Sequence, residues 1–162
     1  MYHARAPGRV NLIGEHTDYT GGDVLPIATD LQTTLTADPA ADVRVHSHAL
    51  DASDGFDPDD FTADETWLDY LKGVYHVLQD EGYDPGGFHG EIAGTLPLGS
   101  GLSSSASLEL AVLCFLDEAY DLGLSRREMA LLGQRVENDY VGVSCGIMDQ
   151  FAVALCREHT AL

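Results

Sequence analysis

Residues 97–107 read PLGSGLSSSAS, a loop of glycines and serines that separates two segments of very different pattern. The preceding FHGEIAGTLP (88–97) is typical of a strand, whereas residues 104–122 carry apolar side chains on nearly every side of a helix. A helix that is apolar all round is buried in a protein core. The loop therefore connects a strand to the N-terminus of a buried helix.

This loop has the properties of a phosphate site. Its glycines let an anion approach the backbone, and the helix N-terminus offers unpaired N–H groups and the positive end of the helix dipole. It is not a Walker loop, which requires a lysine, and Gly101–Ser105 lacks the final glycine of the G-x-S-x-G elbow. A polar turn is the plainer interpretation, but three consecutive serines before a buried helix favour anion binding.

The overall composition describes an acidic globular domain. The 162 residues are 44% hydrophobic, and 27 acidic side chains against 8 basic ones give a net charge of −19. Such a surface repels phosphate backbones and anionic lipids, so neither a nucleic acid nor a membrane is expected as a partner. We interpret the charge as halophilic adaptation, in which a salty cytoplasm screens the self-repulsion.

Cysteine usage and hydropathy indicate a cytoplasmic protein. Cys114, Cys145 and Cys156 are too few and too irregularly spaced for a disulfide framework or a zinc site. The N-terminus has no apolar stretch of signal length, and nowhere do about 18 uncharged apolar residues run together.

Strand patterns occur in the first half of the chain. Residues 2–6 predict a short strand that ends at Pro7-Gly8, and residues 52–64 predict an acidic surface loop. TTLTA (33–37) and VRVHSH (43–48) alternate and are rich in β-branched residues, which predicts a hairpin.

Helix patterns dominate the second half. Capping boxes at residues 62–65 and 125–128 each predict the start of a helix, with Gly82 ending the first helix. MDQFAVALC (148–156) also has helical spacing. Because strands and helices mix without regular βαβ alternation, the sequence predicts an α+β fold.

A second polar loop, GRVNLIGEHTDYTGGD (8–23), contains Arg9, Glu15, His16 and Asp18 between glycines. Each hydroxyl of a sugar both donates and accepts hydrogen bonds, and this mixture of donors and acceptors suits such a ligand. A metal held by His16 and Asp18 is less favoured, because two ligands one residue apart have no further ligands nearby.

Two acidic residues in the second half are candidates for chemistry. Asp149 follows a glycine turn at the start of a helix, where a capping role is the simpler interpretation. Glu137, together with a hydroxyl of Ser104 or Ser105, could supply oxygen ligands to Mg²⁺ beside a phosphate. A solvated helix position is the alternative for Glu137, and Cys145 is disfavoured as a nucleophile because it has no identifiable histidine partner.

Together these motifs resemble those of the GHMP small-molecule kinases, and within that family the galactokinase branch. The resemblance rests on residues 8–22, 97–107 and 145–150 in this order, with WLDYLKGV (67–74) similar to a stretch near the adenine. It implies the GHMP-kinase N-terminal fold, which is ribosomal protein S5 domain 2-like, with a mixed sheet packed against helices. The implied reaction is ATP-dependent phosphorylation of the anomeric hydroxyl of α-D-galactose to galactose 1-phosphate, the first step of galactose catabolism.

The resemblance also implies a role for individual residues. Arg9 and Asp149 match the catalytic pair, and Ser104 and Glu137 match the positions that hold Mg²⁺. The implied sugar contacts are Glu15, His16, Asp18 and Gly146. The implied ATP contacts are Trp67, Tyr70, Pro97, Gly99, Ser100, Gly101, Leu102, Ser103, Ser104 and Ser105.

Members of the galactokinase branch are more than twice as long as this chain, so we expect residues 1–162 to be an N-terminal GHMP domain that lacks its C-terminal partner and is inactive alone. Thr20 and Ser144 depart from the usual asparagine and proline of the branch. Two alternatives remain open: a kinase for galacturonate or N-acetylgalactosamine, and a non-catalytic galactose and ATP sensor.

Overall fold

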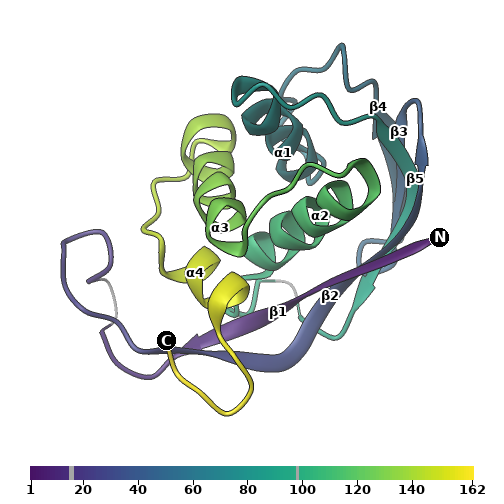
Figure 1. Cartoon of the computed structure of the whole chain (residues 1–162). Coiled ribbons are helices and arrows are strands. Elements are labelled where there is room, and N and C mark those ends of the chain that lie inside the picture. The colour runs from purple at the N-terminus through teal and green to yellow at the C-terminus, as the bar shows by residue number, and fades with distance from the viewer. Residues whose placement is uncertain (15–16, 98) are drawn as a thin grey trace.

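The computed structural model describes residues 1–14, 17–97 and 99–162. A curved five-stranded sheet, in the order β1-β2-β5-β3-β4, carries the helices on one of its faces (Figure 1). The strands are β1 (Tyr2–Asn11), β2 (Pro26–Ala40), β3 (Val43–Ser47), β4 (Ala52–Phe56) and β5 (Gly87–Gly94). The helices are α1 (Asp69–Asp80), α2 (Ser104–Tyr120), α3 (Arg126–Arg135) and α4 (Met148–Leu155), and a π-helical turn η1 (Val136–Val141) follows α3. The predicted α+β class with a mixed sheet is confirmed.

The strand order corrects the predicted hairpin. β5 lies between β2 and β3, pairing antiparallel with β2 and parallel with β3. Residues 33–37 of β2 and 43–47 of β3 are therefore strand residues that do not pair with each other, and His48 follows the end of β3. Alternation shows which side chains face the core, but it does not show which strand lies alongside, and here β5 pairs with both.

Two further strand predictions are wrong. β1 does not end at Pro7-Gly8 but continues to Asn11, with an irregular register between Pro7 and Arg9. β1 is an edge strand, where the missing N–H of a proline is tolerated. Within the expected loop 52–64, residues 52–56 form β4, which pairs with β3.

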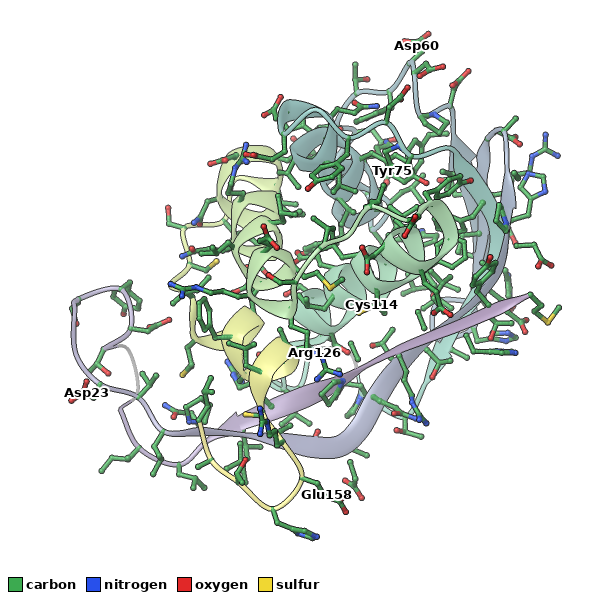
Figure 2. All side chains as sticks on the ribbon, in the orientation of Figure 1. Asp23, Asp60, Tyr75, Cys114, Arg126 and Glu158 are labelled. Atoms are coloured by element: carbon green, nitrogen blue, oxygen red, sulfur yellow. The ribbon has the colours of Figure 1, made fainter. Side chains whose placement is uncertain are left out.

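Helix α2 is the centre of the hydrophobic core, as its sequence predicts. Leu113, Phe115 and Leu116 are fully buried, and Phe115 packs edge-on against Phe88 of β5, with ring centroids 5.0 Å apart. Tyr75 of α1 lies inside between helices and sheet, whereas Asp23, Asp60 and Glu158 lie at the periphery (Figure 2).

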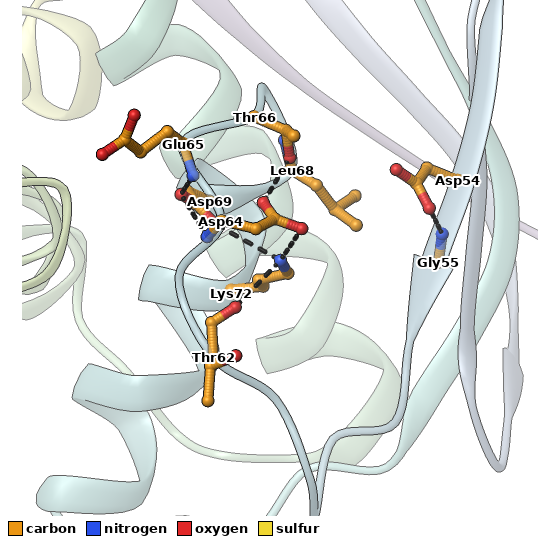
Figure 3. A network of polar contacts seen from close by, with 9 residues as sticks. All are labelled: Asp54, Gly55, Thr62, Asp64, Glu65, Thr66, Leu68, Asp69 and Lys72. Atoms are coloured by element: carbon orange, nitrogen blue, oxygen red, sulfur yellow. Dashed lines mark hydrogen bonds and ion pairs between the residues drawn. The ribbon is translucent and has the colours of Figure 1, made fainter.

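Only one of the two predicted capping boxes forms. At α3 the Ser125 hydroxyl accepts from the Glu128 N–H at 3.2 Å, and the Glu128 carboxylate accepts from the Ser125 N–H at 2.8 Å. Residues 62–65 are not a cap, and α1 begins only at Asp69. The Asp69 carboxylate instead accepts the backbone N–H groups of Asp64 and Glu65 from within the first helical turn (Figure 3).

No helix in the described part of the chain is long and apolar enough to cross a membrane. The three cysteines are free.

Candidate active site

The three polar motifs meet at Asp149, in the first turn of α4. Its Oδ1 atom accepts from Arg9 Nε at 2.9 Å and from Arg9 Nη2 at 2.7 Å, and its Oδ2 atom accepts from the Ser103 hydroxyl at 2.6 Å. Arg9 comes from β1, 140 residues earlier, and Ser103 is the N-cap of α2, 46 residues earlier. The fold thus joins three segments at one carboxylate. They are the early polar loop of residues 8–23, called the sugar-loop motif below, the serine loop of residues 97–107, and the CGIMDQ segment of residues 145–150.

Arg9 also fixes the serine loop. Its Nη1 atom donates to the Gly101 carbonyl at 2.6 Å, and its backbone N–H donates to the Leu102 carbonyl at 3.1 Å. One arginine therefore sets the distance between the loop and Asp149. In an Arg–carboxylate pair the guanidinium gives geometry as well as charge.

Ser103 has an unusual backbone. Its φ is +59° and its ψ is +50°, the left-handed region that costs a non-glycine residue about 1–3 kcal/mol. Its hydroxyl binds Asp149 and does not cap α2, so the Ser103 side chain leaves the first N–H groups of α2 available. Free N–H groups at a helix N-terminus suit a phosphate. The sequence assigned Ser103 to the phosphate loop but did not reveal its contact with Asp149.

The sugar-loop motif reaches the site through Asp18. A Cβ atom at position 146 would overlap the Asp18 carboxylate, so this carboxylate packs against the Gly146 backbone. Gly146 lies three positions before Asp149, so Asp18 contacts the segment that carries Asp149. Glu15 and His16, also predicted to bind sugar, lie outside the described residues.

A cavity of about 220 Å³ opens beside the serine loop. Its lining includes the aromatic side chains Trp67 and Tyr70 and the serines Ser104 and Ser105. The remaining lining is mainly apolar and comes from β5 and nearby residues. A cavity lined by aromatic and apolar side chains, with hydroxyl groups among them, fits the flat base and the phosphates of a nucleotide. Pro97, Gly99 and Ser100 belong to the first part of the serine loop. There the Ser100 hydroxyl donates to the Pro97 carbonyl at 2.8 Å.

Glu137 lies in the π-helical turn and is buried, with 7% of its surface exposed. It accepts from the Ser105 hydroxyl at 2.7 Å, and both Ser104 and Ser105 line the cavity. Between the two serines left open by the sequence, the structure thus brings Ser105 to Glu137. Among described residues no three His, Cys, Asp or Glu side chains gather as a metal site. One carboxylate and one hydroxyl nevertheless fit Mg²⁺, which binds few protein oxygens and keeps water and phosphate ligands.

The surroundings of Cys145 disfavour the thiolate form of its side chain. Burial and the neighbouring Glu137 carboxylate raise the pKa of its thiol to about 12. The thiol is therefore protonated at neutral pH, and the thiolate is the reactive form.

Comparison with known proteins agrees with this geometry. Residues 69–157 match the family described as GHMP kinases N terminal domain, and residues 2–39 match the galactokinase galactose-binding signature. The chain is 56% identical over 157 residues to a galactokinase of Thermococcus kodakarensis, covering 97% of this chain and 45% of that protein. It is 48% identical over 158 residues to a galactokinase of Pyrococcus furiosus, covering 98% and 45%.

Solved structures show the same similarity. The chain superposes on Lactococcus lactis galactokinase complexed with galactose with a TM-score of 0.89 and 41% identity, covering 98% of this chain and 43% of that one. A mevalonate kinase structure, at 22% identity and a TM-score of 0.79, shares the fold. The chain spans about 45% of the length of the curated relatives it matches. With its fold, its serine loop and more than half of its length matched to the family domain, the chain belongs to the GHMP kinase family.

Proposed function

We propose that this chain is the N-terminal domain of a galactokinase, which transfers the γ-phosphoryl group of ATP to the anomeric hydroxyl of α-D-galactose. The observation that carries the proposal is the contact of Asp149 with Arg9 and Ser103, which joins the sugar-loop motif to the phosphate loop. The galactose-binding signature over residues 2–39 supports galactose as the sugar.

Asp149 is the residue that acts on the sugar hydroxyl. The anomeric O–H donates to the carboxylate, and its proton passes to Asp149 as the new O–P bond forms and the bond from the γ-phosphorus to the bridging oxygen breaks. ADP leaves with the electron pair of that bond. Phosphoryl transfer has a loose transition state, so alignment and charge neutralisation provide most of the catalysis. Arg9 supplies both, because it orients Asp149 and adds a positive charge beside the transferred group.

ATP binding is assigned to the cavity and the serine loop. Trp67 and Tyr70 hold the adenine. The serine loop of residues 97–105 and the N-terminus of α2 that follows it hold the phosphates. Ser104 or Ser105 and Glu137 would hold Mg²⁺, which when bound neutralises phosphate charge. Ser105 is the better candidate because it already touches Glu137.

The sugar is assigned to the loop that includes Glu15, His16 and Asp18, next to Gly146. The relatives are about twice as long as this chain, which supports a C-terminal GHMP domain as the covalent partner that completes the site. Free cysteines support a cytoplasmic location.

The test is ADP release from ATP, Mg²⁺ and galactose. Residues 1–162 are assayed alone and as a chimera in which they replace the matching part of the Thermococcus kodakarensis galactokinase. We expect the chimera to release ADP with galactose faster than with galacturonate or N-acetylgalactosamine.

Other outcomes identify the alternatives. Faster turnover of galacturonate or N-acetylgalactosamine would assign a related sugar kinase. Galactose and ATP binding without ADP release would assign a sensor. A chimera that folds but neither binds nor turns over any of these sugars would overturn the proposal.

A further inference from the structure

Two fully buried polar side chains lie near the candidate catalytic carboxylate, Asp149. Glu109 is in the middle of α2, and Gln150 follows Asp149 in α4; neither is exposed. Across the described residues, no hydrogen-bond partner is found for either carboxylate oxygen of Glu109 or for the amide N and O of Gln150. An unpaired buried polar group costs about 1–3 kcal/mol, so two of them together call for a physical reason.

The two side chains border the same glycine. A Cβ atom at Gly133 of α3 would lie 3.2 Å from Gln150 Cγ and 3.5 Å from Glu109 Oε2. Glycine in a helix interior costs about 1 kcal/mol relative to alanine. At this position it leaves room for both side chains between α2, α3 and α4.

The environment of Glu109 favours the protonated, neutral form of its side chain. Burial, together with the Glu137 and Asp149 carboxylates that face it, raises the pKa of Glu109 well above its ordinary value. Burial and the Glu137 carboxylate also raise the pKa of Tyr70, on the neighbouring α1. A protonated carboxyl group has one O–H donor and one carbonyl acceptor.

A neutral carboxylic acid is the complement of a primary amide. The Glu109 O–H can donate to the Gln150 carbonyl while the Gln150 N–H donates to the Glu109 carbonyl, and each side chain then has both a donor and an acceptor in use. The terminal torsions of Glu and Gln are broad, so the two end groups can rotate to turn the donor of one toward the acceptor of the other. An ionised Glu109 could not donate and would leave the amide oxygen unpaired.

We propose that Glu109 and Gln150 form this hydrogen-bonded pair and are positioning residues for Asp149. Helix α2 then holds the first turn of α4 at two points, through Ser103 to Asp149 and through Glu109 to Gln150. Six residues of helix separate the two points by about 9 Å. Two attachments fix both the place and the rotation of the carboxylate, which a single hydrogen bond does not.

The catalytic part of this inference rests on the proposed function, and the experiment uses the chimera described above. Glu109→Gln keeps an uncharged group with a donor and an acceptor, so we expect its kcat within about twofold of wild type. Glu109→Leu has similar bulk but leaves Gln150 unpaired, and we expect about a tenfold lower kcat with the KM for galactose within about twofold. The rescue by glutamine, and the fall in kcat without a change in KM, separate positioning from folding.

Leu110→Ala is the matched control. Leu110 is the next residue of α2, is also buried and borders the same Gly133, but its side chain carries no hydrogen-bonding group. Its cavity lowers the melting temperature, and we expect kcat to stay within twofold. A Glu109→Leu kcat equal to wild type, or a Glu109→Gln variant as slow as Glu109→Leu, would overturn the inference.

A readout without turnover separates this inference from the proposed function. In residues 1–162, the side-chain amide protons of Gln150, followed by NMR, should exchange slowly with solvent in wild type and Glu109→Gln and faster in Glu109→Leu. Equal exchange in all three overturns the pair even if galactose is phosphorylated. Slow exchange in wild type with no turnover of any sugar by the chimera instead retires the proposed function and keeps the pair.

Discussion

Two cation–carboxylate centres of this molecule look alike in composition but differ in exposure. Lys72, the single lysine of the chain, lies at the start of α1 and donates to the Thr62 carbonyl at 3.0 Å, with Asp64 at 2.9 Å and Asp69 at 3.3 Å (Figure 3). Its side chain is 5% exposed. In the other centre, the side chains of Arg9 and Asp149 are 14% and 30% exposed.

The difference separates a structural from a chemical role. The ammonium group of Lys72 has three donors and three partners, so nothing remains for a ligand. Asp149 accepts three hydrogen bonds yet keeps part of its surface open to the site, and a carboxylate has about four acceptor positions. A saturated buried pair holds the chain in place, whereas an oriented and accessible pair can act on a substrate.

The largest effect is expected from Asp149→Asn. The amide keeps the shape but cannot take a proton, so we expect kcat for galactose in the chimera to fall by about 100- to 10,000-fold. Galactose binding should persist, because the sugar is assigned to other side chains. ADP release and galactose titration measure the two quantities, and near-normal turnover would contradict the role of Asp149.

Lys72→Met tests the structural centre. Methionine keeps the apolar stem but leaves the buried Asp69 without its cation, and breaking a buried pair costs about 3 kcal/mol of unfolding free energy. Urea unfolding of residues 1–162 measures this loss. Arg44→Met is the control, because Arg44 and Asp42 form an exposed pair and its loss should change little. Equal stability of the two variants would mean that Lys72 contributes no more than a surface residue.

Ser103→Ala tests the second support of Asp149. Loss of a hydrogen bond to a charged group costs about 1.5–3 kcal/mol, which corresponds to at least about a tenfold lower kcat. Ser53→Ala removes an exposed hydroxyl of β4, outside the assigned sites, that contacts His46 Nδ1 at 2.9 Å, and should keep kcat within about twofold. If both variants behave alike, the Ser103 contact does not position Asp149.

The smallest effect concerns the acidic surface. Raising KCl from 0.1 M to 1 M shortens the Debye length from about 10 Å to about 3 Å, so the repulsion of a −19 chain weakens. We expect the melting temperature to rise by about 3 °C, the effect of roughly 1 kcal/mol. The deficit of Lys72→Met should be similar in both salts, because a buried pair is screened less. Equal melting of wild type in both buffers would remove the halophilic interpretation.

Sequence reasoning succeeded where the structure is local. The Ser125 capping box forms because both of its hydrogen bonds lie within one helical turn. The equivalent pattern at residues 62–65 fails because the Asp69 carboxylate accepts from the Glu65 N–H, the group that the Thr62 side chain would have capped. The sequence is compatible with either acceptor, Thr62 or Asp69, for this N–H group. In the folded chain Asp69, which also pairs with Lys72, is the acceptor.

By itself the sequence determined the α+β class, the buried helix of residues 104–120 and the motifs that define the family, since these follow from residue types and their near neighbours. Only the tertiary structure decided that β5 separates β2 from β3, that Ser105 touches Glu137, and that Arg9 meets Asp149 across 140 residues. Contacts between distant segments depend on how the sheet and its helices pack together, and a local sequence pattern does not specify which distant segments come into contact.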